Sequence, residues 1–307
     1  MVPVNAIATR NRFDFISLHP PRHNVVAEVL DGLQQPQKVI SPKYFYDERG
    51  SQLFEAITRQ PEYYPTRCER QLLTDYADDI AHQLGSNITL IEPGCGSCEK
   101  VRLLLDAVQP HRYVAMDISE QFLLKSANLL AAQYPWLEIT GVCADFSQIS
   151  KMPALPDDGR KIAFYPGSTL GNFEPTSAME FLKSLRALVG KRGGLLIGVD
   201  THKDAEILDA AYNDAAGITA EFNLNVLAHL NRVLPANFDL EQFSHQAFYN
   251  QRLRRIEMHL SSKLNQTVTC AGKEIEFHAG ESIHTECSYK YSISEFSTQS
   301  QHTGFAV

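Results

Sequence analysis

Two glycines one residue apart, Gly94 and Gly96, mark the stretch of this chain whose residue types point most clearly to chemistry. A short apolar run, residues 88–91, precedes them, and a helical pattern, residues 100–108, follows. Glycine permits backbone angles that are closed to other residues, and the start of a helix offers free N–H groups and the positive end of a dipole. The stretch therefore predicts a strand, a tight loop and a helix that together hold a nucleotide-like ligand.

The residues beside these glycines narrow the class of ligand. A dinucleotide fingerprint would have a third small residue where this chain has Glu99, whose charge would repel a pyrophosphate. Glu92, two residues before the first glycine, suits a ligand with a cationic part and no phosphate. The pattern Glu-x-Gly-x-Gly after a strand resembles the first motif of the doubly wound S-adenosylmethionine-dependent methyltransferases. A lone Gly-x-Gly turn can also be a simple strand-to-helix corner, so further residues must support this interpretation.

Acidic residues at the ends of the next two strands give that support. Asp117 ends a strand 23 residues after Gly94, where an acid can accept both ribose hydroxyls. Asp145 and Phe146 follow the next strand and could bond the adenine amino group and cover its face. The local alternative for Asp117 is a helix N-cap ahead of Glu120.

The elements around these residues alternate between strand and helix. Such a rhythm predicts an α/β fold with a doubly wound parallel sheet, helices on both faces and a ligand crevice at the carboxyl ends of the strands. Expected strands are 88–91, 111–117, 137–143, 161–165 and 195–200, and expected helices are 24–33, 51–58, 69–84, 100–108, 120–134 and 177–189. After residue 200 two helices, 204–216 and 218–234, lead into alternating apolar and polar segments that predict antiparallel strands.

This change of rhythm predicts two domains. Residues 66–200 and 289–307 are assigned to the Rossmann-like sheet, and residues 1–65 and 201–288 to a smaller α+β substrate-binding domain.

Composition excludes several classes of partner. A net charge of −8 over 307 residues disfavours nucleic acid, and no apolar run is long enough to cross a membrane. The first residues have no apolar core of a signal peptide, so we expect a cytoplasmic protein, and we expect a monomer. Six cysteines without a secretion signal are expected to stay reduced. Cys95 and Cys98 could nominally form a zinc site with His284 and Cys287, but a single Cys-x-x-Cys is common and no metal is expected.

Six stretches, in order along the chain, resemble the histidine-specific α-N-methyltransferases of ergothioneine biosynthesis. They are residues 43–47, 61–67, 94–100, 167–172, 212–217 and 285–290, and the similarity runs from about residue 35 to 290. Matches spread over both expected domains are more specific than the glycine loop alone.

The resemblance implies roles for individual residues. S-adenosylmethionine would contact the strand-end loops, namely Gly94, Gly96, Lys100, Asp117, Asp145, Phe146, Gly167 and Ser168. Asn172 and Tyr212 would hold the carboxylate of L-histidine, with Asn172 also near the amine beside Tyr46, so that Tyr46 and Asn172 are the catalytic candidates. Glu286 and Ser288, helped by Tyr63, would hold the imidazole. Residues two apart on a strand point to one face, which is consistent with such a pair.

The implied reaction is displacement at the sulfonium methyl by the neutral α-amine, three times over, which gives the N-trimethyl betaine. Two alternatives stay open at this point: a methyltransferase for another small amine, or a binding module without activity. In the family the chain returns to the first domain after the position of Tyr289 and adds a helix and two closing strands. Here we expect a helix from residue 294 and one strand at 305–307, which leaves the sheet edge bare.

Overall fold

The computed structural model describes residues 13–18, 22–145 and 158–307, together with residues 149, 152, 155 and 156. Its larger sheet has six strands in the order β1-β5-β4-β3-β6-β7, and every neighbouring pair is parallel. The strands are β1 (Phe13–Ser17), β3 (Ile88–Pro93), β4 (Arg112–Asp117), β5 (Glu138–Cys143), β6 (Arg160–Tyr165) and β7 (Gly194–Ile197). The strand order reverses between β3 and β6, so loops after these two strands open a crevice, as in doubly wound folds.

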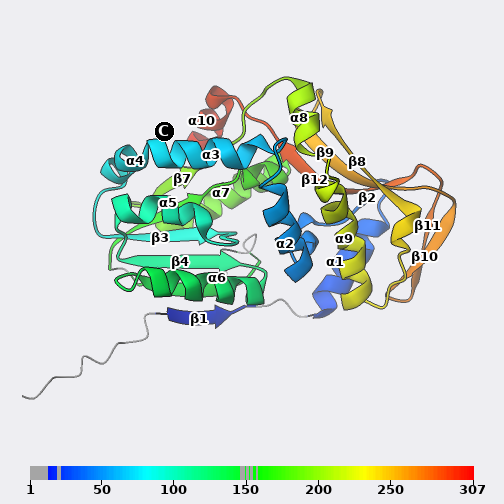
Figure 1. Cartoon of the computed structure of the whole chain (residues 1–307), viewed down its shortest axis with the longest axis horizontal. Helices are drawn as coiled ribbons and strands as arrows, with labels where there is room; N and C mark the ends of the chain where they lie inside the picture. The colour runs from blue at the N-terminus through cyan, green and yellow to red at the C-terminus, as the bar shows by residue number, and fades with distance from the viewer. Residues whose placement is uncertain (1–12, 19–21, 146–148, 150–151, 153–154, 157) are drawn as a thin grey trace, which may run out of the picture.

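Helices cover both faces of this sheet, as predicted. One face packs against α3 (Tyr64–Asp75), α4 (Ala77–Leu84), α5 (Glu99–Val108) and α6 (Glu120–Gln133), and the other against α7 (Pro175–Val189). β3 is buried along its whole length, because a central parallel strand has helices on both sides. Figure 1 shows this sheet with β3 and β4 in the left half of the molecule.

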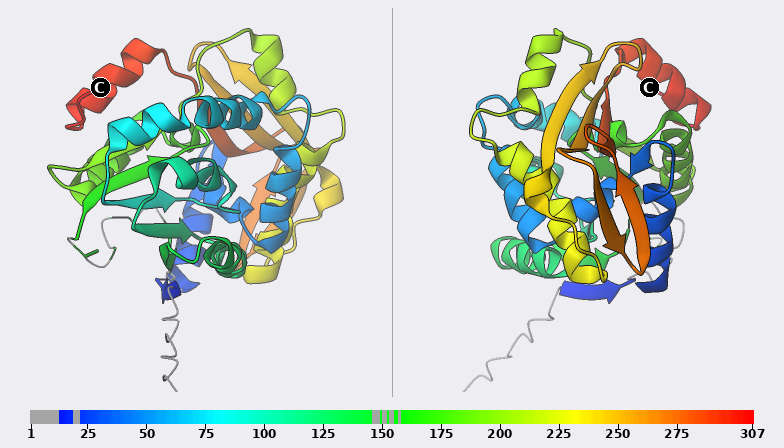
Figure 2. Two further views of the ribbon diagram at one scale, coloured as in Figure 1. Left: turned by 60° about the vertical axis from the view of Figure 1, so that its left-hand side comes forward. Right: turned by 90° about the vertical axis from the view of Figure 1, so that its right-hand side faces the viewer.

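The second region is built on a four-stranded sheet in the order β2-β12-β9-β8. Its strands are β2 (Lys38–Val39), β8 (Phe243–Asn250), β9 (Arg255–Ser262) and β12 (Ser282–Tyr289), and a separate hairpin joins β10 (Gln266–Cys270) to β11 (Lys273–Phe277). The helical elements of this region are α1 (Arg22–Leu33), η1 (Pro42–Phe45), α2 (Glu48–Ile57), α8 (Ala205–Ala211), α9 (Ile218–Val233) and η4 (Leu240–Gln242). Figure 2 shows the blue α1 beside the yellow and orange strands, although these segments lie far apart in the sequence.

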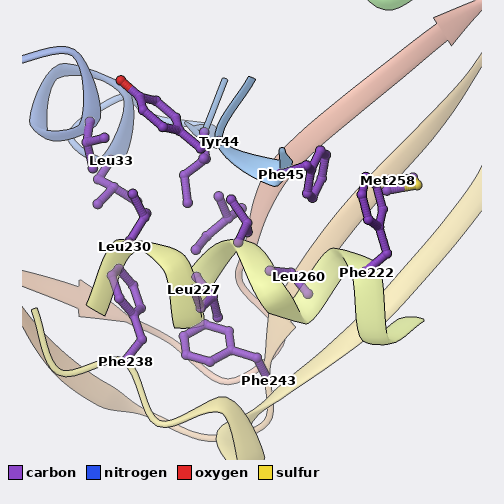
Figure 3. Close-up of a cluster of buried hydrophobic side chains, with 14 of the residues drawn as sticks. Leu33, Tyr44, Phe45, Phe222, Leu227, Leu230, Phe238, Phe243, Met258 and Leu260 are labelled. Atoms are coloured by element: carbon purple, nitrogen blue, oxygen red, sulfur yellow. The ribbon is translucent and has the colours of Figure 1, made fainter. Parts of the chain in front are cut away.

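One apolar core unites the early and late segments of this second region. Leu33 and Phe45 are fully buried with Leu230 and Phe243, and Phe45 stacks on Phe222 with ring centroids 4.5 Å apart. Figure 3 shows these side chains converging on α9 from η1 and the strands. Burying an aromatic side chain of this size stabilises the fold by about 2–3 kcal/mol. The grouping of residues 29–63 with 208–283 therefore has a physical basis in a shared core.

The N-terminal strand corrects the expected assignment of residues 1–65 to the smaller domain. β1 pairs with β5 at the edge of the large sheet, where Phe15 lies opposite Gly141. A Cβ at Gly141 would lie 3.1 Å from the ring of Phe15 and 3.3 Å from the ring of Phe13, so the glycine leaves room for both rings. The assignment was wrong for residues 13–17, which form a strand of the large sheet and pack their phenylalanine rings over Gly141.

Of three further expected elements, one is confirmed and two differ in the structure. The helix expected over 69–84 is two helices, which meet at Tyr76 with a non-helical φ of −111° and ψ of 17°. The expected helix after residue 294 is α10 (Ile293–His302), drawn in red at the periphery in Figure 2. Residues 305–307 form no strand; the buried ring of Phe305 instead lies 5.4 Å from the Arg186 guanidinium on α7. β7 is consequently the last strand on its side of the sheet among the described residues.

Candidate active site

The glycine loop joins β3 to α5 in left-handed backbone conformations. Gly94 has a φ of 73°, Gly96 of 53° and Cys98 of 55°, a region that favours glycine. The N–H groups of Gly94 and Cys95 both donate to the Met116 carbonyl, at 2.8 and 2.9 Å, which fixes the loop against β4. A Cβ built on Gly96 would meet nothing within 4 Å, so open space lies directly over the main chain there. This is the geometry expected of a loop that a ligand approaches closely.

Asp117 ties this loop to the end of β4. Its Oδ2 accepts from the Gly96 N–H and its Oδ1 from the Ser119 N–H, both at 2.9 Å. Burial raises the pKa of Asp117, and these backbone N–H groups oppose the shift. Ser119, and not Asp117, is the N-cap residue of α6. A carboxylate has about four lone-pair sites, so Asp117 keeps acceptor capacity for a ligand beyond the two bonds that hold the loop.

A carboxylate absent from the sequence-based prediction connects the two loops at the reversal of the strand order. Glu69, on α3, accepts from the Gly167 N–H at 2.7 Å and pairs with Lys100 Nζ at 2.7 Å. A Cβ at Gly198 would lie 2.0 Å from Glu69 Oε1, so this glycine makes space for the carboxylate. No sequence motif marks Glu69, because its partners come from three separate segments.

The remaining predicted cofactor residues have the following positions. Asp145 is buried at the end of β5 and pairs with Lys43 Nζ at 3.2 Å, which links the large sheet to η1. Ser168 Oγ accepts from the Asp200 N–H at 2.8 Å and so anchors the end of β7. Phe146 lies outside the described residues.

The predicted substrate residues meet where the 3-10 helix η3 (Thr169–Asn172) reaches β12. Asn172 Nδ2 donates to Glu286 Oε2 at 3.1 Å, across a sequence separation of 114 residues. Burial raises the pKa of Glu286 to about 7, and Lys290 opposes the shift. A β-bulge between His284 and Glu286 leaves Thr285 as the extra residue, so Glu286 pairs with Met258.

Ser288 shares this face of β12, as the two-residue spacing predicts. Tyr212 OH donates to Ser288 Oγ at 2.9 Å, and Lys290 Nζ donates to the same oxygen at 2.9 Å. Lys290 also pairs with Asp200 Oδ2 at 3.0 Å, and the Tyr64 hydroxyl donates to Asp200. Sequence reasoning missed both Lys290 and Asp200 as members of this network, because their pairing joins the ends of β12 and β7.

Three tyrosines line the same region. The rings of Tyr63 and Tyr212 are 6.1 Å apart edge to face, and the ring of Tyr46 stands edge-on to Phe222 at 5.8 Å. Burial raises the pKa of all three hydroxyls, and the charge of Glu286 raises each further. Asp117 also raises the pKa of Tyr46, which shows that Tyr46 lies within electrostatic reach of both the glycine loop and Glu286. The hydroxyls therefore stay protonated at neutral pH and can donate hydrogen bonds.

The residues considered for a zinc site can be located in the structure. Among the residues that the structure describes, no three His, Cys, Asp or Glu side chains converge as metal ligands. The four residues considered for zinc have other contacts; Cys287, for example, donates to the Asn172 carbonyl at 3.4 Å. No helix in the described part of the chain combines the length and apolar character needed to span a bilayer.

Comparison with known proteins identifies the family. The family described as "Histidine-specific methyltransferase, SAM-dependent" matches residues 25–307. The chain belongs to this family. It is 42% identical over 270 residues to the histidine N-alpha-methyltransferase of Mycolicibacterium smegmatis and 40% identical over 270 residues to that of Mycobacterium tuberculosis, in each case covering 86% of this chain and 83% of the relative. It is also 33% identical over 264 residues to ergothioneine biosynthesis protein 1 of Schizosaccharomyces pombe, covering 81% of this chain and 34% of that longer protein.

The methyl donor of this family fits the glycine-loop end of the site. The donor is a cation with a ribose and an adenine, and the open main chain at Gly96 and the free acceptor capacity of Asp117 suit the neutral and hydroxyl-bearing parts of such a ligand. This histidine-specific methyltransferase is an enzyme of the α/β class, as the sequence predicted.

Proposed function

We propose that this methyltransferase transfers three methyl groups from S-adenosylmethionine to the α-amine of L-histidine and releases the N-trimethyl betaine. The observation that carries the proposal is the bond between Asn172 and Glu286, beside which Ser288 presents its hydroxyl on the same face of β12. An amide from η3 and a carboxylate and a hydroxyl from β12 converge there. That set matches an amino acid whose side chain has both an N–H group and a bare nitrogen.

The division of roles follows from what each group can donate or accept. Asn172 and Tyr212 offer donors to the substrate carboxylate, and Glu286 accepts the N–H of the imidazole. A pocket of this kind rejects amino acids without a polar ring, because the second oxygen of Glu286 and the hydroxyl hydrogen of Ser288 would be left without a partner. Tyr63 closes the pocket through its edge-to-face contact with Tyr212.

The chemical step needs alignment more than a strong base. S-adenosylmethionine supplies an electrophilic methyl group on a sulfonium. The lone pair of the amine forms the new C–N bond while the C–S bond breaks and sulfur keeps its electron pair. Each of the first two products must lose an N–H proton before the next attack, and the third product has none to lose. Tyr46 is protonated, lies within the electrostatic influence of both Asp117 and Glu286, and orients the amine through these stages.

Mass spectrometry of the products tests the proposal. Purified enzyme is incubated with S-adenosylmethionine and a mixture of L-histidine, other amino acids and biogenic amines at equal concentration. We expect mono-, di- and trimethylated histidine in sequence, with the trimethylated form accumulating. Preferential methylation of any other amine would overturn the substrate assignment, and binding of the donor without any methylated product would overturn the activity.

A further inference from the structure

Lys290 follows β12 directly and is a buried cation. It contacts the acceptor site, by which we mean the residues proposed to hold the amino acid that is methylated: Asn172, Tyr212, Glu286 and Ser288. Its side chain is 1% exposed, and its Nζ lies 3.0 Å from Asp200 Oδ2 and 2.9 Å from Ser288 Oγ. It also lies 5.4 Å from the centroid of the Tyr212 ring. A buried ammonium is costly unless it is paired and hydrogen-bonded, so a lysine at this place needs a reason beyond packing.

Asp200 keeps this lysine charged. Burial lowers the pKa of Lys290, and the Asp200 carboxylate opposes that shift. Burial alone would raise the pKa of Asp200, but Lys290, Lys203 and Tyr64 hold it below its ordinary value. Lys203 Nζ contacts the other carboxylate oxygen at 2.6 Å. Because Lys290 Nζ lies 3.0 Å from a carboxylate oxygen and within hydrogen-bond distance of Ser288 Oγ, the pair is an ammonium and a carboxylate, and the ammonium can only donate hydrogen bonds.

The contact with Ser288 decides what that hydroxyl can do. A serine hydroxyl has two acceptor lone pairs and one O–H donor. Tyr212 OH and Lys290 Nζ both donate to Ser288 Oγ, which uses both lone pairs. If Tyr212 turned toward a substrate carboxylate, Lys290 would still hold one lone pair and repel the hydroxyl hydrogen. Ser288 is thus left to donate its O–H, while Glu286 on the same face is an acceptor.

We propose that Lys290 is a positioning residue that sets Ser288 as a hydrogen-bond donor, so that the pocket selects a neutral ring with an N–H facing Glu286 and a bare nitrogen facing Ser288. The inference rests on the proposed function, because it takes the imidazole to lie between Glu286 and Ser288. The substrate feature that the site recognises is then a ring with one hydrogen-bond donor and one acceptor in a fixed orientation.

Histidine and two kinds of analogue separate the two hydrogen bonds. Histidine has both the N–H and the bare nitrogen. The pyrrole analogues, 3-(pyrrol-2-yl)alanine and 3-(pyrrol-3-yl)alanine, have only an N–H, at one or the other ring position, and the thiazole analogues, 3-(thiazol-4-yl)alanine and 3-(thiazol-5-yl)alanine, have only a bare nitrogen, so the better substrate of each pair is the one compared with histidine. In the unaltered enzyme, kcat/KM for histidine exceeds that for either analogue by at least about tenfold, since each analogue leaves one buried group unpaired. In Lys290→Met the histidine-to-pyrrole ratio falls about tenfold, because Ser288 is free to turn its hydroxyl elsewhere. The histidine-to-thiazole ratio, which reports on Glu286, stays unchanged.

Lys203→Met is the matched control. This variant removes Lys203, the other lysine that pairs with Asp200 and one that makes no contact with Ser288. Both substrate ratios are expected to stay unchanged. Lys290→Met in a Ser288→Ala background has no further effect on the pyrrole ratio if Lys290 acts through Ser288. Should Lys290→Met fold poorly, Lys290→Met with Asp200→Asn removes both buried charges and carries the same expectation.

The outcomes distinguish this inference from the proposed function. An equal fall of both ratios in Lys290→Met, or no change in either, overturns the role of Lys290 while histidine methylation stands. A persistent effect of Lys290→Met in the Ser288→Ala background overturns it as well. If the unaltered enzyme does not methylate histidine, the proposed function fails before any variant is measured.

Discussion

The glycine loop and the acceptor site are built in different ways. The loop is held by its own main-chain N–H groups: those of Gly94 and Cys95 donate to the Met116 carbonyl, and that of Gly96 donates to the Asp117 carboxylate, about 20 residues along the chain. The acceptor site is held by side chains, such as the Asn172–Glu286 and Tyr212–Ser288 pairs, which lie 114 and 76 residues apart in sequence. Backbone contacts tolerate side-chain change, whereas side-chain contacts encode specificity. The comparison teaches that the glycine loop is fixed by contacts within one segment, whereas the residues predicted to hold the acceptor are brought together from distant segments.

Replacing Glu286 by alanine has the largest expected effect and should affect the acceptor end alone. The variant loses the buried acceptor for the imidazole N–H, so kcat/KM for histidine falls by about 100-fold or more. Steady-state kinetics measure this loss, and calorimetry measures the Kd for S-adenosylmethionine, which should stay within about twofold. Glu286→Gln is the matched control for volume. A parallel loss of donor affinity would break the distinction between the two ends.

Replacing Asp117 by asparagine should do the reverse. The amide keeps the size of the carboxylate but removes a charge-assisted acceptor for the Gly96 N–H, a contribution of about 1.5–3 kcal/mol. The Kd for S-adenosylmethionine is expected to rise about 10- to 100-fold, and the ranking of acceptor substrates should not change. Calorimetry and the amine competition assay provide the two readouts. A changed ranking of the amine substrates would mean that the glycine loop also contributes to substrate selectivity.

Replacing Glu92 by glutamine, next to the glycine loop, has the smallest expected effect on turnover and tests stability instead. The Glu92 carboxyl group is buried at the end of β3, just before the glycine loop, accepts from Tyr113 OH at 2.6 Å, and has its pKa raised by burial to about 8. Between pH 4.5 and 8 the unfolded chain has released this proton and the folded chain has not, so raising the pH favours unfolding through this group. Glu92→Gln should therefore reduce the loss of stability between pH 5.5 and 8 by about 1–3 kcal/mol.

Urea unfolding at the two pH values measures that change. The turnover of histidine at pH 7 should remain close to that of the unaltered enzyme, in contrast to Glu286→Ala. An unchanged pH slope in Glu92→Gln would show that this carboxyl does not titrate in the folded state over that range.

Several features could be predicted from the sequence because they depend on contiguous residues. The strand, glycine loop and helix around residues 88–108 follow from local periodicity and from glycine's access to left-handed φ angles. The shared face of Glu286 and Ser288 follows from the two-residue period of a strand, although the bulge at Thr285 was not foreseen.

Other features could not be predicted, since they depend on contacts between distant segments. Glu69 has no motif of its own and is recognisable only from its partners Gly167 and Lys100. β1 joins the large sheet beside β5, where Gly141 leaves space for two phenylalanine rings. The sequence around residue 13 does not predict that β1 pairs with β5.

The sequence by itself determined the parallel sheet, the glycine loop and the order of strand-end residues, because backbone preference and hydrophobic period are local properties. Only the tertiary structure decided which charges meet in the interior. Lys290 and Asp200 each look like ordinary polar residues after a strand, and they become a buried ion pair only because the segments that follow β12 and β7 run side by side. Burial makes such pairing obligatory, and burial is a property of the folded chain rather than of any segment of it.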